Sequence, residues 1–164
     1  MNPFTAPVGF KKIGWEKIDI QRMEIRDLED VLSIETTSSP TPWSLNMFAH
    51  ELQHPNAFCF VMKPAKGGPP LVIGFICFRN VIEESELLNI AVHPHHRRLG
   101  YGKKLMEFYI DFCRPLGIKT FYLEVNPSNQ AAIHLYQIFD FKCVGRREKF
   151  YQGRFDALLF RKNI

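Results

Sequence analysis

Apolar side chains recur along this chain with two spacings, near every second residue in some segments and near every third or fourth residue in others. The first spacing is typical of a half-buried strand and the second of an amphipathic helix. We expect strands over residues 18–25, 57–62, 71–81, 87–92, 120–125, 143–151 and 156–161. We expect helices over residues 26–35, 43–52, 102–114 and 129–139.

Strands and helices alternate through the centre of the sequence, which indicates an α/β fold with a mixed sheet that is antiparallel at its ends. About four helices are expected to flank this sheet. With 164 residues, the chain is expected to form a single domain. Residues 1–16 mix Pro, Gly and Lys with isolated aromatic residues, so we expect an irregular extension there and the domain over residues 17–164.

Small and polar residues predict where these elements begin and end. The run PAKGGPP at residues 64–70 predicts a turn, and the acidic stretch 83–86 (EESE) predicts a second one. Asp27 and Ser44 stand at helix starts, where their side chains are expected to cap backbone N–H groups. Gly74, inside an apolar strand, predicts a bulge or the close approach of another segment.

Composition narrows the class of protein. A hydrophobic content of 46% and an aromatic content of 13% fit a globular protein and argue against a disordered chain. The net charge of +4 suits an anionic ligand but does not require one. No apolar stretch approaches the ~20 residues of a membrane span, and the first ten residues lack the apolar segment of a signal peptide. We therefore expect a cytoplasmic protein that does not bind a membrane.

Cysteine and histidine give no sign of a metal site. The cysteines, Cys59, Cys77, Cys113 and Cys143, lie far apart within apolar runs and form no Cys-x-x-Cys pair, so we expect buried, reduced thiols. The run His-Pro-His-His at residues 93–96 has no carboxylate or thiol beside it. Its imidazoles are therefore expected to be solvated loop side chains, and no bound metal is expected.

The stretch HRRLGYGKKL at residues 96–105 carries the clearest chemical signal, because it joins an apolar strand to a helix. Gly100 and Gly102 allow a tight turn in which successive backbone N–H groups point to one spot. Such a turn at the positive end of a helix dipole suits a phosphate group. Arg97 and Arg98 add positive charge that suits phosphate oxygens.

Residues 97–102 (RRLGYG), after the strand segment 87–94 (LLNIAVHP), resemble the Q/R-x-x-G-x-G/A loop of the GCN5-related N-acetyltransferases (GNAT). The resemblance covers roughly residues 23–160 and implies a GNAT-type domain in which the two central parallel strands splay apart in a V. It also implies acetyl-CoA as co-substrate, with the pyrophosphate on the loop and the pantetheine arm along the preceding strand. The cofactor-binding residues so implied are Ile90, Ala91, Val92, Arg97, Arg98, Leu99, Gly100, Tyr101, Gly102, Lys103, Asn129 and Tyr136.

Further motifs, at residues 42–44 (PWS), 123–129 (LEVNPSN), 135–136 (LY) and 146–147 (RR), resemble the subgroup that acetylates protein N-termini. Within it, the likeness is to the ribosomal-protein-alanine N-acetyltransferases. The resemblance implies Glu124 as general base and Tyr136 as general acid. The chemistry agrees, because an α-amine titrates near ~8 and needs only a modest base near neutral pH. A phenol can protonate the departing thiolate. Asp140 replaces the family's usual glycine at a helix exit, where Asp tolerates left-handed geometry.

The resemblance implies the N-terminal α-amine of a protein as acceptor, with a ribosomal protein as one candidate. A lysine side chain or a small amine is an alternative, although a lysine amine near pKa ~10.4 is harder to deprotonate. A non-catalytic acyl-CoA-binding module is another alternative. The presence of both Glu124 and Tyr136 argues against it. The acidic stretch 83–86 could steer a basic peptide. No direct contact with nucleic acid is expected from Arg146, Arg147 and Lys149. The protein is expected to be a monomer or a homodimer.

Overall fold

The computed structural model describes residues 18–65, 71–151 and 153–164. The expected extension over residues 1–16 lies outside the described residues, as do most of the turn over residues 64–70 and the tip of the last hairpin at residue 152. The strands are β1 (Ile18–Arg22), β2 (Ala57–Pro64), β3 (Gly74–Val81), β4 (Glu84–Val92), β5 (Thr120–Val125), β6 (Lys142–Tyr151) and β7 (Phe155–Asn163). The α-helices are α1 (Leu28–Ser38), α2 (Leu45–Gln53), α3 (Tyr101–Cys113) and α4 (Gln130–Ile138). Short 3-10 helices are η2 (Ile25–Asp27), η3 (Pro94–His96) and η4 (Arg114–Leu116).

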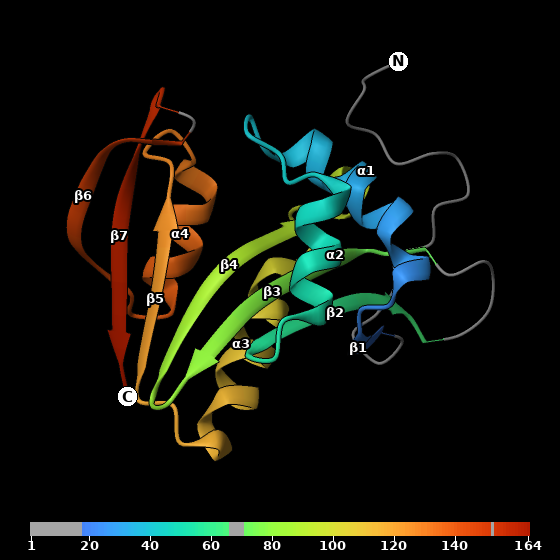
Figure 1. Cartoon of the computed structure of the whole chain (residues 1–164), viewed down its shortest axis with the longest axis horizontal. Coiled ribbons are helices and arrows are strands. Elements are labelled where there is room, and N and C mark those ends of the chain that lie inside the picture. Colours follow the sequence, from blue (N-terminus) through green and yellow to red (C-terminus); the bar gives the residue numbers. More distant parts are fainter. Residues whose placement is uncertain (1–17, 66–70, 152) are drawn as a thin grey trace.

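The strands form one seven-stranded sheet in the order β1-β2-β3-β4-β5-β7-β6. Neighbouring strands are antiparallel except for β4 and β5, which are parallel (Figure 1). The connection between these two strands carries α3, as expected for a parallel crossover. The mixed α/β sheet with four α-helices confirms the predicted fold class.

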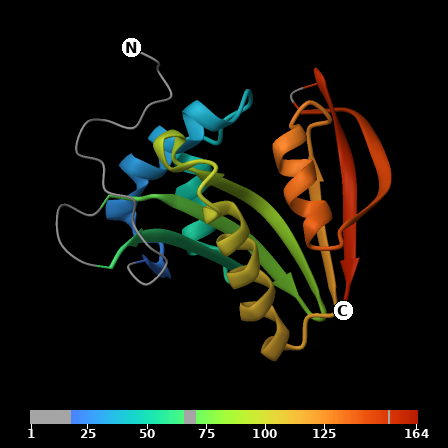
Figure 2. The same ribbon diagram turned by 180° about the vertical axis from the view of Figure 1, so that it is seen from behind.

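The two parallel strands part from each other along their length. They pair with each other from Glu84 with Thr120 as far as Leu87 with Leu123. Beyond that point β4 continues to Val92 and β5 to Val125 without pairing to each other. An irregularity on the other side of β4 lies at the same level, where the pairing of β3 with β4 shifts between Cys77 and Phe78. Figure 1 shows the resulting V-shaped opening, and Figure 2 shows it from behind. The predicted splay is confirmed.

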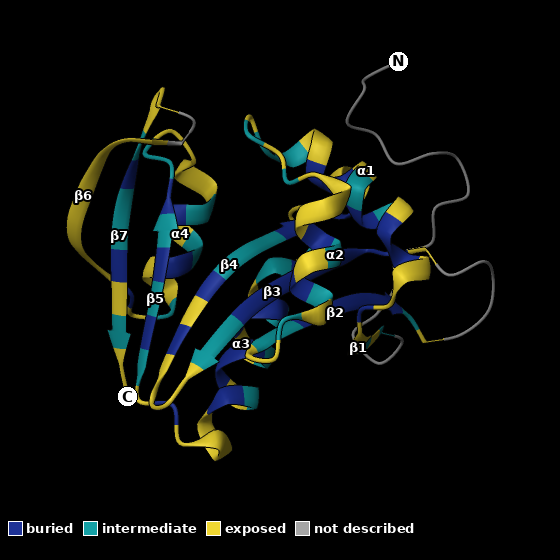
Figure 3. Cartoon of the chain, viewed as in Figure 1, coloured by how far each residue is buried: buried dark blue, intermediate teal, exposed yellow. Residues whose placement is uncertain are grey.

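Two hydrophobic cores lie on opposite faces of the sheet. The first is formed by α3 and α4 with one set of strand side chains, and it includes Tyr109 of α3, Phe78 of β3 and Phe121 of β5. The second is formed by α1 and α2 with the alternate set, and it includes Phe48 of α2 and Phe75 of β3. Figure 3 shows the buried residues along β2 and β3, whereas β6, at the sheet edge, is exposed along most of its length. The part of β4 that has left β5 therefore has one helical layer on each side.

Gly74 lies where β3 and β4 pack tightly against α3. A Cβ atom added to Gly74 would come within 2.8 Å of the Ala91 carbonyl oxygen and 3.3 Å of Leu105. The predicted close approach is thus confirmed. Within the described residues, no helix is long and apolar enough to cross a membrane.

Several local predictions need correction. The turn before β4 is shorter than residues 83–86, because Glu84, Ser85 and Glu86 already pair with β3. Asp27 does not cap α1, since its carboxylate accepts from the Glu24 N–H and pairs with Lys63. Ser44 does cap α2, accepting from the Met47 N–H at 3.2 Å.

Cys143 corrects another prediction, because it is exposed whereas the other three cysteines are buried. It lies on β6, which is the edge strand of the sheet beside β7 and is exposed from residue 142 to residue 150. The apolar character of the surrounding sequence reflects strand propensity at an edge rather than burial.

Candidate active site

The end of β4 leads into a turn of unusual backbone geometry at the opening of the V. Arg98 has φ of 60° and Gly100 has φ of 84°, both in the left-handed region. Gly100 then serves as the N-cap position of α3. A backbone that alternates in this way can turn successive N–H groups toward one point. The tight turn expected from Gly100 is thus present, and anion binding there stays a prediction.

The first turn of α3 leaves backbone N–H groups without a partner inside the helix. The Lys104 N–H bonds the Gly100 carbonyl oxygen at 3.1 Å, and the N–H groups before it in the helix point out of its positive end. A Cβ atom at Gly102 would meet Leu135 of α4 at 3.4 Å and no other described atom within 4 Å. Because Gly102 has no side chain, α3 can pack beside Leu135 of α4 and the backbone at Gly102 stays uncovered.

The Arg97 side chain forms two hydrogen bonds at the opening of the V. Its Nε donates to the Val92 carbonyl oxygen at 3.0 Å, and an Nη atom donates to the Ser38 hydroxyl at 2.8 Å. It thereby ties the end of β4 to the end of α1. Arg98, Leu99 and Lys103 are at least partly exposed beside it. Arg97 thus has a structural contact in addition to the predicted role toward phosphate.

The histidines before this loop are not all solvated, which corrects the prediction. His96 is 2% exposed and packs against the rings of His93 and Tyr101, whereas His95 is exposed. Burial, with smaller contributions from His93 and His95, lowers the pKa of His96 to about 4. Within the described residues, no group of three or more His, Cys, Asp or Glu side chains is placed to hold a metal ion.

This buried imidazole predicts a loss of stability in acid. Its folded pKa of about 4 lies below the ordinary value of 6.5, so between these pH values the unfolded chain binds a proton that the folded chain does not. The free energy of unfolding should therefore fall as pH drops from 6.5 toward 4, by up to about 3 kcal/mol from this group. Urea unfolding at several pH values should show a smaller decrease for His96→Gln.

His95→Gln is the matched control, because this neighbour is exposed. Its acid dependence should equal that of the unaltered protein. If His96→Gln and His95→Gln depend on pH in the same way, the assignment to His96 is wrong.

Glu124 is the first residue of β5 beyond its last pair with β4. Its neighbours Leu123 and Val125 point to the core under α3 and α4, so Glu124 faces the opposite side of the sheet, where α1 and α2 lie. Its side chain is 15% exposed. Burial raises the pKa of this carboxyl, Arg147 lowers it, and Glu86 raises it. The carboxylate is thus held at the opening of the V with a raised pKa.

Arg147 is a part of this site that the sequence did not identify. Its guanidinium on β6 lies 3.2 Å from a Glu124 carboxylate oxygen, although β7 separates their strands in the sheet. In the sequence, the motif Arg146-Arg147 indicated a resemblance to the family but did not predict a contact with Glu124. Arg146 instead pairs with Asp156. A signal was present in the alternation of β6, which places these two arginines on opposite faces.

Tyr136 and Asn129 lie on and before α4. Tyr136 is 5% exposed and belongs to the core under α3 and α4, with the rings of Phe141 and Phe160 nearby. Asn129 is exposed and caps α4, accepting from the Ala132 N–H at 3.2 Å. Asp140, just after α4, has φ of 62°, as expected for the residue that replaces a helix-exit glycine.

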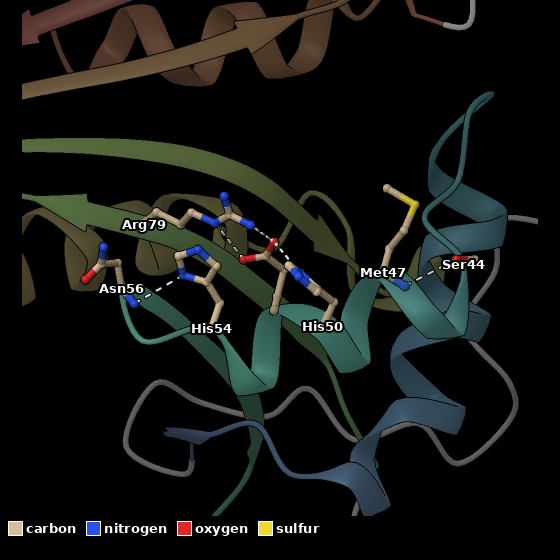
Figure 4. Close-up of polar contacts among 7 residues, drawn as sticks. Ser44, Met47, His50, His54, Asn56 and Arg79 are labelled. Atoms are coloured by element: carbon tan, nitrogen blue, oxygen red, sulfur yellow. Dashed lines mark hydrogen bonds and ion pairs between the residues drawn. The ribbon is translucent and has the colours of Figure 1, made fainter.

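A hollow of about 330 Å³ lies against α2, on the face of the sheet that Glu124 shares. Trp43, Asn46, Met47, His50 and Glu51 line it. Glu51 is buried and accepts from Arg79 of β3, with the Arg79 Nε at 2.9 Å. Figure 4 shows the Arg79 guanidinium on this carboxylate, which also lies near His50, with Met47 one turn earlier on α2. Sequence reasoning did not identify this hollow, because its lining residues other than Trp43 belong to no motif in the sequence.

Comparison with known proteins decides which chemistry this arrangement serves. The family model described as "Acetyltransferase (GNAT) family" matches residues 28–141. The chain belongs to this family. GNAT proteins transfer an acetyl group from acetyl-CoA to an amine, so the protein is an acetyl-CoA-dependent N-acetyltransferase. The predicted family, enzyme class and co-substrate are confirmed.

Individual relatives resemble the chain over most of its length. The [ribosomal protein bS18]-alanine N-acetyltransferase of Escherichia coli is 34% identical over 143 residues, covering 85% of this chain and 93% of the relative. A crystal structure of the E. coli ribosomal-protein-S18-alanine N-acetyltransferase aligns with a TM-score of 0.79 and 33% identity, covering 90% of this chain and 94% of that one. Arabidopsis thaliana NAA60 with a bisubstrate analogue has a TM-score of 0.81 at 22% identity, covering 90% and 99%, and shares the fold.

Acetyl-CoA fits the residues at the opening of the V. The left-handed residues Arg98 and Gly100 and the N-terminus of α3 suit its pyrophosphate. The backbone of β4 between Ile90 and Val92 has no partner on the β5 side, so it can bind an extended amide chain there. We therefore retain the predicted cofactor-binding residues as the proposed site.

Gly102 gives a direct test of this site. Gly102→Val should lower the affinity for acetyl-CoA by about tenfold or more, because its branched side chain covers the backbone that approaches the pyrophosphate. Gly102→Ala adds only the Cβ, which meets Leu135 in ordinary contact, and should bind nearly as well as the unaltered protein. Titration calorimetry, at a temperature where thermal unfolding shows both variants to be folded, measures this difference. Equal affinity of folded Gly102→Val and the unaltered protein would place the pyrophosphate elsewhere.

Proposed function

We propose that this GNAT enzyme acetylates the α-amine of a protein N-terminus that begins with a small residue such as alanine. The observation that carries this proposal is the similarity, at 34% identity, to an enzyme named for transfer to an alanine of ribosomal protein bS18. Alanine has no nitrogen in its side chain. Within a protein it can therefore be N-acetylated as a free amine only at the N-terminus. A ribosomal protein is the leading candidate acceptor, and the cytoplasm is the proposed place of action.

Glu124 is the proposed general base. It lies where the two strands part, on the face of the sheet that also carries the hollow beside α2. An α-amine titrates near ~8, so a carboxylate with a raised pKa can accept its proton directly or through water near neutral pH. Arg147 keeps the carboxylate ionised and oriented.

Tyr136 is the proposed general acid. It lies on α4, on the other side of the sheet from Glu124, and its ring is fixed within the core. Acetyl-CoA supplies the activated acetyl group and a thiolate leaving group that must be protonated. The phenol of Tyr136 is the proposed donor of that proton, and a backbone N–H of β4 within residues 90–92 is proposed to stabilise negative charge on the carbonyl oxygen. Base and acid thus act from opposite faces through the opening of the V.

The hollow beside α2 is the proposed site for the acceptor's first residues. Trp43 and Met47 give it apolar walls, and Glu86 lies on the same face of β4, paired in register with Arg79. The acidic stretch 83–86 was expected to steer a basic peptide. Within it, Glu83 forms an ion pair with Lys119 at 2.6 Å. Glu84 and Glu86, which are exposed on the same face of β4, are therefore the members that remain placed to attract a basic acceptor.

A peptide panel tests the acceptor. Peptides of one sequence, with Ala, Ser, Gly, Met or Leu as first residue, should be acetylated in an order that favours the small residues, with Ala among the best. The same Ala peptide with its α-amine already blocked is the control and should not react. Steady product formation from the blocked peptide would show that a side-chain amine is the acceptor, which contradicts the proposal.

The expected boundary of the domain at residue 17 remains a proposal, as does the expectation of a monomer or homodimer. The family match begins at residue 28 and the first described strand begins at Ile18. Both observations agree with a catalytic domain that starts after residue 16.

A further inference from the structure

Glu35 is a buried acid that the proposed chemistry does not use. It lies near the end of α1, is 2% exposed, and is surrounded by the core that α1 and α2 form on the sheet. Burial raises the pKa of this carboxyl, while the Trp43 N–H and the side chain of Asn89 lower it. A buried carboxyl is costly unless its oxygens are hydrogen-bonded, so its presence needs a reason.

The two oxygens of Glu35 have different surroundings. Oε1 accepts from the Trp43 N–H at 2.9 Å, which fixes the entrance to α2. Oε2 is buried, and no hydrogen bond of ordinary length reaches it from the described part of the chain. The Asn89 side chain lies near enough to favour the charged form of Glu35 without completing such a bond. One carboxyl is thus placed between the segment that opens α2 and strand β4.

The two neighbours of Glu35 lie at the two proposed substrate sites, one for the acceptor and one for acetyl-CoA. Trp43 lines the hollow proposed for the acceptor. Asn89 lies on β4 beyond its last pair with β5, next to the backbone proposed to hold the pantetheine arm. Its register partner Cys77 belongs to the core under α1 and α2, so Asn89 faces Glu35 rather than α3. The distance between the acceptor hollow and the acetyl donor therefore depends on the elements that Glu35 links.

We propose that Glu35 is a positioning residue that sets the acceptor hollow against the opened part of β4, and so determines how well the acceptor amine is placed. This inference rests on the proposed function. A purely structural role fits the observations less well, since an apolar residue could fill the same space without leaving an oxygen unsatisfied. Glu35 acts through Trp43 and Asn89 and is not itself a catalytic residue.

Steady-state kinetics of Glu35→Ala, Glu35→Asp and Glu35→Gln in the full chain test this role. Alanine removes the acceptor for the Trp43 N–H, and aspartate is one methylene too short to reach it. Loss of a hydrogen bond to a charged group should raise the KM for the acceptor peptide by about tenfold. The KM for acetyl-CoA should stay within about twofold of its original value, because the pyrophosphate loop is untouched. Glutamine retains an oxygen for Trp43 and should restore most of the acceptor KM.

Glu29→Gln is the matched control, since Glu29 lies on the same helix and is exposed. It should change neither KM. An unchanged acceptor KM in both Glu35→Ala and Glu35→Asp would overturn the proposal, and so would a parallel rise in both KM values. If Glu35→Ala does not fold, Glu35→Asp and Glu35→Gln decide by the same comparison. The acceptor in this test is the best substrate of the peptide panel. The comparison of KM values therefore tests Glu35 whether the α-amine or a lysine of that peptide is acetylated.

Discussion

Replacing Glu124 with glutamine should lower the rate of acetyl transfer by about 100-fold or more near neutral pH, the usual effect of losing general base catalysis. Glutamine keeps the size of the side chain but cannot accept the proton. The rate should recover in part above pH ~8, where the acceptor α-amine is already neutral. The affinity for acetyl-CoA should not change. Initial rates across a pH series, with calorimetry of acetyl-CoA binding, measure both effects.

Arg147→Gln is the matched variant for this prediction, because it removes the ion pair and leaves the base. Arg147 lowers the pKa of Glu124, so its removal raises that pKa further. The base is active only when ionised, and the loss of activity in acid should therefore begin at a higher pH than in the unaltered enzyme. If Arg147→Gln loses activity at the same acidic pH as the unaltered enzyme, and Glu124→Gln keeps full activity, Glu124 is not the base.

Tyr136→Phe should reduce the maximal rate strongly at every pH, again by about 100-fold. The ring that packs near Phe141 and Phe160 is retained, so the variant should fold. Unlike Glu124→Gln, it should not be rescued at high pH, because hydroxide cannot supply a proton to the departing thiolate. Near-normal rates across the pH range would assign protonation of the sulfur to water or to another group. Measured acetyl-CoA affinity close to the original value separates lost catalysis from lost binding.

Much of the fold follows from local sequence signals. Strand β5 begins and ends where the alternation of residues 120–125 predicts, because each of its apolar side chains is buried against α3 and α4. The start of α2 follows from Ser44, whose side chain forms the expected cap. The loop before α3 follows from its glycines, and Gly100 does adopt a left-handed conformation. In each case a few neighbouring residues contain the physical cause.

Other features depend on contacts between distant segments, which no local pattern predicts. Glu84 and Glu86 read as a polar turn, yet pairing with β3 makes them part of β4. His96 belongs to a polar run, yet it is buried because the short helix η3 turns it under Tyr101. The pairing of Glu124 with Arg147 and the burial of Glu35 both require knowledge of which strands and helices are neighbours. The catalytic candidates could be predicted from motifs, whereas the residues that support them could not.

Mass spectrometry of a peptide with two acceptor amines tests most directly the central claim, that the enzyme acetylates a protein N-terminus. The peptide begins with alanine and contains one internal lysine, so that it offers an α-amine and an ε-amine in the same molecule. After incubation with acetyl-CoA and enzyme, fragmentation locates the added acetyl group. We predict that it lies on the α-nitrogen of alanine, with the lysine unmodified, and that Glu124→Gln gives little of this product at neutral pH. Acetylation of the lysine with a free α-amine would contradict the proposed function.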